Sequence, residues 1–369
     1  TTEIYTLSLH DALPILIKFI IENSRTTSFH FEAAADLFDE EMINLLAAIP
    51  EGLIQLEIGV QTTNEKTLML INRKTSLDKL FENVRKIREK GNIHIHLDLI
   101  AGLPDENMES FKKSFNSVYS AKPHNLQLGF LKMLKGSKIR EDAEKYGYSY
   151  RHYPPYEVLS NEEISFDEIL MLKDVEEVLE RYYNSSRFQK TLSYIISVIE
   201  ESSNALTAFD FYRELALYCR EKGYLSRPVQ AKNLYNILYS YVKQINNPHI
   251  DYHLFNDLMK FDFLSTDNTN NLPDCINTIR PDRFQDMCFE FLKNEENIEK
   301  YLPHYKGLPD KQIFKKVNFQ VFSYTIPANK YSPEMTIILF DYGQPKSPVS
   351  GCYKWDDITC EFETQLKNG

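Results

Sequence analysis

The fold is decided by two stretches of the chain, LIQLEIGVQ at residues 53–61 and NIHIHLDLIAGLP at residues 92–104. In each, aliphatic residues alternate with polar ones: Gln55, Glu57 and Gln61 in the first, and His94, His96 and Asp98 in the second. Because successive side chains of a strand point to opposite faces, each stretch predicts a strand with one aliphatic and one polar face. Helical patterns follow both, so we expect parallel strands whose aliphatic faces lie under helices. The polar faces would then line an enclosed ligand site.

Length and composition are those of a soluble globular protein with two domains. The chain has 369 residues, of which 43% are hydrophobic and 26% charged, and its net charge is -11. This acidic balance argues against a nucleic-acid-binding surface, which needs clustered Lys and Arg. The five cysteines all lie after residue 218 and show no CxxC spacing, so no zinc site or disulfide framework is indicated. We expect a cytoplasmic protein with no membrane segment.

The first fifteen residues, TTEIYTLSLHDALPI, have an origin of their own. They match, codon for codon, the translation of the adapter of a common short-read sequencing library. We therefore expect residues 1–15 to be an artefact and the native gene to begin upstream, and we leave them out of the fold prediction.

From residue 16 to residue 150 the pattern alternates between strand and helix. Strands are predicted near residues 28–36, 53–61, 93–101 and 124–134, with helices near residues 39–49, 64–71, 76–90 and 107–120. Such spacing is typical of βαβ units. Four units are about half of a closed eight-stranded barrel, so the fold class is α/β, an incomplete TIM-like barrel.

The Pro- and Tyr-rich stretch RHYPPYEVLSNEEIS begins at residue 151 and predicts a domain boundary. Residues 151–300 read as mostly helical. Residues 301–369 form a short β-rich region, with strands near residues 316–326 and 334–342 joined by residues 351–363 in a small antiparallel sheet.

The polar residues also resemble a known family. GVQT at residues 59–62, NRKT at residues 72–75 and DLIAGLP at residues 98–104 are similar to the later strands of radical S-adenosylmethionine (radical SAM) enzymes. FHFEAAADLFDEEMINLL, from residue 29, is similar to the third strand of that family and its following helix. The resemblance covers residues 16–150. It is to the subgroup with an N-terminal cobalamin-binding domain and a C-terminal domain of unknown function.

The resemblance implies roles for individual residues. Glu32 would lie near the amino group of S-adenosylmethionine, Gln61 would contact its ribose or methionyl part, and Arg73 would pair with its carboxylate. Asp98 would accept a hydrogen bond from a ribose hydroxyl, and Gly102 would let the backbone approach the adenine.

One feature of that family is missing from the sequence. Its [4Fe–4S] cluster is held by three cysteines in a CxxxCxxC loop, and this chain has no such loop. We expect the cluster ligands, and any cobalamin site, to belong to the missing N-terminal part. The chain alone should then be inactive, whereas the complete protein would start radical chemistry with electrons from a flavodoxin or ferredoxin. Its substrate, and any catalytic residue, are not identified by the sequence.

Simpler interpretations of the same residues stay open. Glu32, Gln61, Arg73 and Asp98 could form a structural polar network. His94, His96 and Gln127 could line a substrate cavity; the two histidines could instead be structural, or bind a metal. Two other classes of protein also fit: a cluster-free barrel enzyme with Asp98 and His96 as acid and base, and a non-catalytic protein whose helical half recruits a partner.

Overall fold

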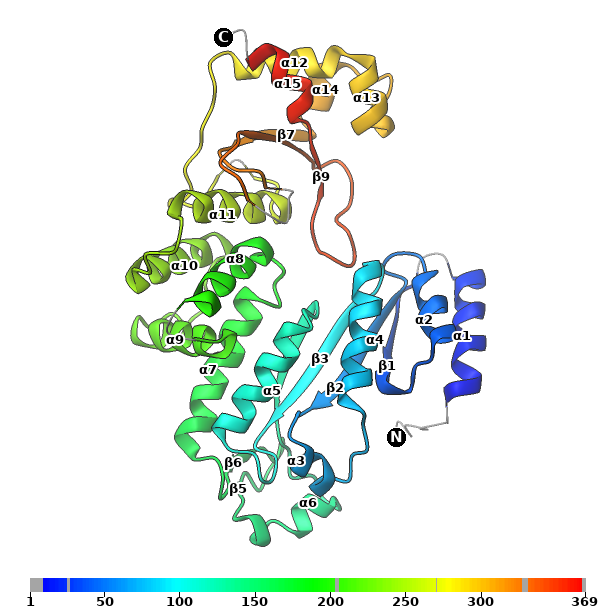
Figure 1. Ribbon diagram of the computed structural model, residues 1–369, viewed down its shortest axis with the longest axis vertical. Coiled ribbons are helices and arrows are strands. Elements are labelled where there is room, and N and C mark those ends of the chain that lie inside the picture. Colours follow the sequence, from blue (N-terminus) through cyan, green and yellow to red (C-terminus); the bar gives the residue numbers. More distant parts are fainter. Residues whose placement is uncertain (1–8, 25–26, 203–205, 270, 327–330, 367–369) are drawn as a thin grey trace. The chain divides into compact units, whose positions relative to one another are not determined.

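A parallel four-stranded sheet organises the amino-terminal part of the protein. The computed structural model describes residues 9–24, 27–202, 206–269, 271–326 and 331–366. The strands are neighbours in chain order: β1 (Phe29–Glu32), β2 (Ile54–Gln61), β3 (His94–Ala101) and β4 (Asn125–Phe130) (Figure 1). The predicted half of an α/β barrel is confirmed.

Helices cover the aliphatic face of this sheet, because each crossover between parallel strands carries one. On β2, Ile54, Leu56, Ile58 and Val60 are all at most 2% exposed. Asp39 caps the second helix, as predicted, by accepting a hydrogen bond from Met42 N–H at 2.8 Å. The helices preceding and connecting the strands are α1 (Leu9–Asn23), α2 (Glu40–Ala47), α3 (Glu65–Leu70), α4 (Leu77–Lys90) and α5 (Met108–Ser120), with a 3₁₀ turn, η1 (Ala35–Leu37), after β1.

Helix α1 begins within the segment that we predict to be adapter-derived. Residues 1–8 of that segment lie outside the described residues. The origin of residues 1–15 therefore stays a prediction.

The first compact unit of the structure continues beyond the strands. It comprises residues 1–184, 207–226 and 348–350; the end of the barrel at residue 150 stays a prediction. The unit extends beyond residue 150 because α7 packs on β4 and α9 packs on α5. After β4 the unit contains α6 (Lys138–Glu141), η2 (Glu144–Tyr146), the antiparallel strands β5 (Ser149–Tyr150) and β6 (Val158–Ser160), α7 (Phe166–Tyr182) and α9 (Ala208–Glu221).

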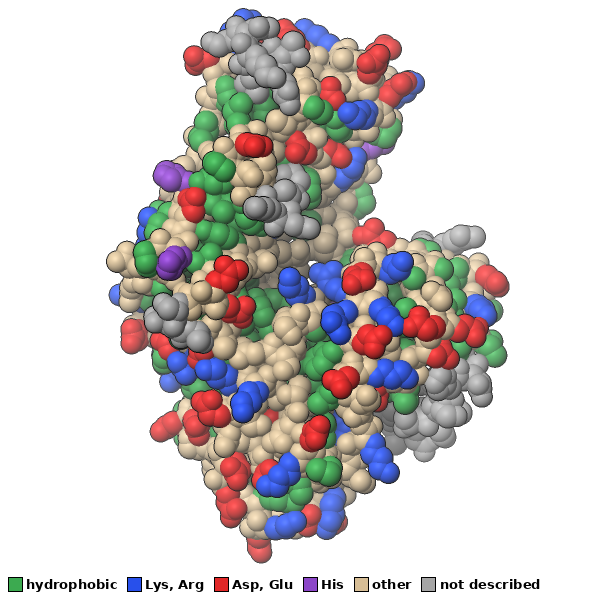
Figure 2. Space-filling model, in the orientation of Figure 1, with side chains coloured by type: hydrophobic (Ala, Val, Ile, Leu, Met, Phe, Trp, Pro, Cys, Tyr) green, Lys and Arg blue, Asp and Glu red, His purple; other side chains and the backbone are tan. Residues whose placement is uncertain are grey.

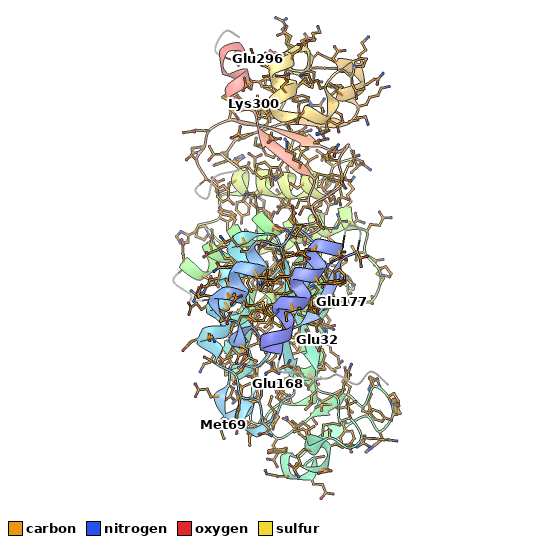
Figure 3. The ribbon with its side chains drawn as sticks, turned by 90° about the vertical axis from the view of Figure 1, so that its right-hand side faces the viewer. Glu32, Met69, Glu168, Glu177, Glu296 and Lys300 are labelled. Carbon is orange, nitrogen blue, oxygen red and sulfur yellow. The ribbon has the colours of Figure 1, made fainter. Side chains whose placement is uncertain are left out.

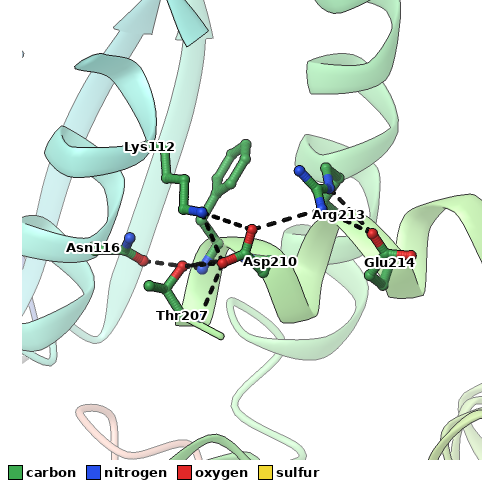
Figure 4. A network of polar contacts seen from close by, with 7 residues as sticks. Lys112, Asn116, Thr207, Asp210, Arg213 and Glu214 are labelled. Carbon is green, nitrogen blue, oxygen red and sulfur yellow. Dashed lines mark hydrogen bonds and ion pairs between the residues drawn. The ribbon is translucent and has the colours of Figure 1, made fainter. Parts of the chain in front are cut away.

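Helix α9 is attached to α5 by a polar network as well as by aromatic packing. Lys112 Nζ on α5 lies 2.9 Å from the buried carboxylate of Asp210. Asp210 also forms a capping box with Thr207, and the backbone N–H of Phe209 donates to Asn116 Oδ1 at 3.0 Å (Figure 4). These contacts hold a helix from far along the chain against the barrel.

The second compact unit is built around α11 (Tyr252–Thr266). From Leu254 to the end of this helix every residue is buried, so other elements surround it. The remaining elements of the unit are α8 (Gln189–Glu201), α10 (Ala231–Ile245), α12 (Phe284–Lys293), α13 (Glu295–Tyr301), η3 (Pro303–Tyr305), α14 (Asp310–Phe314), β7 (Val317–Phe322), β8 (Thr336–Asp341), β9 (Lys354–Asp357) and α15 (Thr359–Leu366).

The predicted small antiparallel sheet is confirmed in the order β7-β8-β9. The prediction that its third segment extends through residue 363 is wrong, because the strand ends at Asp357 and α15 follows. The Asp357 carboxylate accepts a hydrogen bond from Thr359 N–H at 3.0 Å. This local bond turns the chain out of the sheet.

Two further observations concern the predictions about membranes and nucleic acids. No helix in the described part of the chain is long and apolar enough to cross a membrane. On the face drawn in Figure 2, acidic and basic side chains are interspersed over α4.

Candidate functional site

The candidate site is the polar face of the parallel sheet. The predicted division of β2 and β3 into an aliphatic and a polar face is confirmed: the aliphatic side chains are buried and the polar ones are half-buried. The face is open at its two edges, because Glu32 on β1 and Gln127 on β4 are exposed. Figure 3 shows Glu32 near the middle of the view, on the side of the molecule that carries β1. The polar face is thus less enclosed than the sequence predicted.

The carboxyl end of β2 has an unusual backbone. Gln61 has φ = 69°, and the pairing register with β3 shifts between Gly59 and Gln61. A residue other than glycine with positive φ is strained. A Cβ at Gly59 would overlap the side-chain amide of Gln61, so the amide of Gln61 lies over the open backbone of Gly59.

Arg73 is brought to the same place by the short helix α3. Asn64 caps α3 by accepting from Lys66 N–H at 3.1 Å, and after the helix Asn72 adopts φ = 58°. The chain then turns back, and Arg73 Nη2 donates to the carbonyl oxygen of Gly59. Arg73 therefore lies on the polar face of the sheet. From the sequence alone, a position at the surface near the end of a helix was equally consistent.

Asp98 faces this group from β3. It pairs in register with Gly59 on one side and with Gln127 on the other. Burial, and after it the carboxylates of Glu57 and Glu32, together raise the pKa of Asp98 to about 7, although Arg73 acts in the opposite direction. At neutral pH this carboxyl group can therefore exist in either protonation state.

Three buried polar atoms at this end of the sheet have no hydrogen-bond partner among the described residues. They are Gln61 Oε1, Arg73 Nε and Asp98 Oδ1. Leaving buried polar atoms unsatisfied is costly, about 1–3 kcal/mol each. Unpaired acceptors and a guanidinium donor gathered beside a glycine suit a small ligand with hydroxyl and carboxylate groups.

Histidines occupy the amino-terminal end of the polar face. The ring centroids of His94 and His96 are 4.7 Å apart, those of His94 and His124 are 4.8 Å apart, and His30 packs edge-on against His96 at 5.6 Å. Burial is the main cause that lowers the pKa of His94 to about 4 and of His124 to about 3. These two rings are therefore neutral at pH 7.

The histidine group does not have the arrangement of a metal centre. Within the described ranges, no group of three or more His, Cys, Asp or Glu side chains could hold a metal ion. His124 Nδ1 instead accepts a hydrogen bond from Ile95 N–H at 3.0 Å, which joins the amino ends of β3 and β4. His94 Nδ1 is buried and has no hydrogen-bond partner within the part of the chain that the structure describes.

Sequence reasoning missed a buried carboxyl group next to the site. Glu106, 1% exposed, follows β3 and accepts hydrogen bonds from Thr62 Oγ1 and, at 3.3 Å, from Ser114 Oγ. Its Oε2 is buried with no hydrogen-bond partner in the described ranges, and burial raises the pKa of Glu106 to about 7. Glu106 lies in a loop, where no hydrophobic periodicity predicts burial. Its position shortly after the GLP turn is the only sequence feature that could have indicated its burial.

Gly102 has a packing role that does not depend on a ligand. Its φ is +86°, and a Cβ there would lie 3.3 Å from Val158 Cγ1. Its carbonyl oxygen accepts a hydrogen bond from Tyr148 Oη at 2.9 Å. The structure thus brings Gln61, Arg73 and Asp98 together, places Glu32 at the open edge, and surrounds Gly102 with residues 148–161.

Comparison with known families gives two matches. Residues 6–118 match the family described as the Radical SAM superfamily, and residues 144–340, more than half of the chain, match a family described as a protein of unknown function (DUF4080).

Curated relatives share only part of their length with this chain. An uncharacterised protein of Bacillus subtilis, YtqA, is 29% identical over 111 residues, which is 30% of this chain and 34% of the relative. The ribosomal protein uS12 methylthiotransferase RimO of Caldicellulosiruptor saccharolyticus is 28% identical over 28% of this chain and 23% of its own. The chain thus spans about a third or less of these relatives.

Among solved structures, coproporphyrinogen III oxidase (HemN) from Escherichia coli, described as a radical SAM enzyme, is similar over 46% of this chain and 36% of its own, with 20% identity and a TM-score of 0.34. The methyltransferase TsrM from Kitasatospora setae is similar over 42% of this chain and 32% of its own, with 16% identity and a TM-score of 0.33.

Proposed function

Because the chain belongs to the DUF4080 family and its amino-terminal part to the Radical SAM superfamily, we propose that the carboxyl end of β1–β3 binds S-adenosylmethionine. Arg73 pairs with the methionine carboxylate, for which a guanidinium is well shaped. Gln61 contacts the ribose or the methionyl part, and Asp98 accepts from a ribose hydroxyl. Glu32, at the open edge, takes the amino group.

The observation that carries this proposal is the set of three unpartnered buried atoms, Gln61 Oε1, Arg73 Nε and Asp98 Oδ1. They combine acceptors and a donor beside the open backbone of Gly59. A purely structural network would satisfy its own buried atoms. When bound, S-adenosylmethionine supplies the adenosyl group of radical chemistry; the residues here bind and orient it.

The [4Fe–4S] cluster does not fit this chain. A cluster needs thiolate ligands, and the first cysteine is Cys219, in the last turn of α9. The residues of this chain therefore provide no ligand set for the cluster. We propose that the cluster ligands, an electron donor such as flavodoxin or ferredoxin, and any cobalamin belong to the complete cytoplasmic protein; no residue here is assigned to them.

The binding proposal is tested by calorimetric titration of this chain with S-adenosylmethionine. We expect saturable binding that Arg73→Met and Asp98→Asn each weaken about ten-fold, the loss of a charge-assisted hydrogen bond. Arg85→Met and Asp78→Asn, both at exposed positions of α4, are the matched controls. Absence of binding, or equal losses in the controls, would contradict the proposal.

A second candidate function is favoured by the pKa of Asp98, which lies close to 7. A carboxyl group with that pKa suits general acid–base catalysis, with His96 two residues earlier as its partner. The two candidate functions are distinguished by reconstituting the complete gene product anaerobically with iron and sulfide. Formation of 5′-deoxyadenosine supports the radical enzyme, and a protein without iron–sulfur absorbance supports the cluster-free barrel.

A further inference from the structure

The second compact unit contains a polar cavity of about 180 Å³ beside the first turn of α11. Its walls come from four separate parts of the chain, one of which is the stretch before α12 that contains Asn277 and Ile279. Tyr239 and Lys243 belong to α10, Tyr252 and Asp257 to α11, and Ser323 follows β7. Because sites for drug-sized ligands measure roughly 300–1,000 Å³, this cavity admits only a small molecule.

The walls of the cavity are fixed by contacts outside it. Asp251 caps α11 by accepting from His253 N–H at 2.9 Å. Lys260, 1% exposed on the same helix, donates to the carbonyl oxygen of Val321 at 2.7 Å. The ring of Tyr239 stacks on Phe255 with centroids 6.1 Å apart. The cavity is therefore preorganised, which lowers the entropic cost of binding.

The charges that line the cavity are not balanced. The carboxylate of Asp257 is already engaged, because Ser323 N–H donates to its Oδ2 at 2.5 Å and the buried Lys260 lies one turn further along α11. Lys243 has no carboxylate partner in the described structure, and its Nζ lies 3.7 Å from the ring centroid of Tyr252. The available charge in the cavity is thus positive.

Tyr252 adds a donor to this positive charge. Its hydroxyl oxygen is buried and has no hydrogen-bond partner among the described residues. A buried hydroxyl normally finds a partner. Lys243 is exposed, and its Nζ lies over the rings of both Tyr252 and Tyr239. An anionic oxygen would accept from this ammonium group and from the Tyr252 hydroxyl at the same time.

We propose that this cavity binds a small organic anion through a carboxylate or phosphate group. The anionic oxygens contact Lys243 Nζ and the Tyr252 hydroxyl, and the body of the ligand lies against the ring of Tyr239. This site belongs to the part of the chain that matches the family of unknown function. It is independent of the S-adenosylmethionine site on the parallel sheet.

The test is saturation-transfer NMR on the full chain with three probes of similar shape: phenyl phosphate, benzoate and phenol. We expect one or both anions to bind and phenol not to bind, and the preferred anion gives the chemical class of the ligand. Lys243→Met should weaken binding about ten-fold and Tyr252→Phe about five-fold, the loss of a charged and a neutral hydrogen bond respectively.

The matched control is Lys346→Met, because Lys346 also lies over a tyrosine ring, at 5.0 Å from the centroid of Tyr353, but does not line the cavity. Thermal unfolding followed by circular dichroism shows whether each variant is folded. Binding of phenol as tight as that of the anions, no binding of either anion, or unchanged binding in folded Lys243→Met would each overturn the proposal.

Discussion

Gly59 matters to the candidate site because it has no side chain. A Cβ at this position would overlap the amide of Gln61 and approach Arg73 Nη2 to 3.4 Å. The amide is the end of a flexible side chain and can move away. We therefore expect a side chain at this position to disturb the proposed ligand site more than the fold.

We predict that Gly59→Ala leaves the unfolding midpoint nearly unchanged but weakens S-adenosylmethionine binding about ten-fold, because the displaced amide fills the binding space. Urea denaturation and calorimetry measure the two effects. The control is Gly129→Ala on β4, where a Cβ would make only ordinary contact, 3.5 Å from the Leu99 carbonyl oxygen. A large loss of stability without a loss of binding would contradict the prediction.

Glu106 makes the stability of the protein depend on pH. Its folded pKa of about 7 lies above the ordinary 4.5, so its contribution to stability is fully present below pH 4.5 and is lost as the pH rises through 7. For a side chain that is 1% exposed, the full contribution is about 3 kcal/mol.

We predict that Glu106→Gln removes this part of the pH dependence. Free energies of unfolding from urea titrations at pH 5 and pH 8 should differ less in the variant than in the wild type, by about 2–3 kcal/mol. Asp98 contributes with the same sign in both proteins, so the readout is the difference between them. Glu109→Gln, at an exposed position of α5, should behave as the wild type; an unchanged slope in Glu106→Gln would be evidence against a buried, protonated carboxyl.

At the scale of elements, the sequence correctly predicted the strands and caps that depend on the local residue pattern. The alternation in residues 54–61 and 94–101 correctly gave β2 and β3, and Asp39 was correctly placed as the cap of α2. The predicted strand over residues 351–363 was wrong outside residues 354–357. Helix α15 begins at Thr359, whose N–H and hydroxyl both donate to the Asp357 carboxylate. Positive φ at Gln61 and the burial of Glu106 depend on contacts distant in sequence, so no local pattern shows them.

The attachment of α9 to α5 gives a prediction at this scale. Asp210→Ala removes the partner of the half-buried Lys112 and the capping box of Thr207 (Figure 4). We expect a loss of unfolding free energy on the order of 1–3 kcal/mol, measured by urea denaturation. Glu214→Ala, which removes only a surface partner of Arg213, should cost less than about 0.5 kcal/mol. Equal effects would contradict the assignment.

At the scale of the whole molecule, the sequence indicated an α/β part followed by a mostly helical part, and the structure has both. It did not show that the chain passes between the two compact units several times. Packing of α9 on the barrel rests on Phe115, whose ring centroid lies 5.3 Å from that of Phe209. Aromatic residues nearly a hundred positions apart give no sequence signal of their contact.

This packing predicts how fragments behave. A fragment of residues 9–150 would expose Phe115, which is fully buried in the intact chain, whereas residues 9–226 keep its partners on α9. We expect the shorter fragment to bind a hydrophobic dye and to be digested faster by protease than the longer one. Equal protection of both fragments would show that α7 and α9 are not needed by the barrel.

The central claim, that the polar end of the parallel sheet holds S-adenosylmethionine, is tested most directly at Asp98. Carboxyl carbon NMR of chain labelled at aspartate, with Asp98→Asn for assignment, gives the pKa of Asp98 with and without the ligand. We predict a pKa near 7 in the free chain that falls when S-adenosylmethionine is added, because a donated hydrogen bond favours the ionised carboxylate. An Asp98 titration that does not change at saturating ligand would contradict the account.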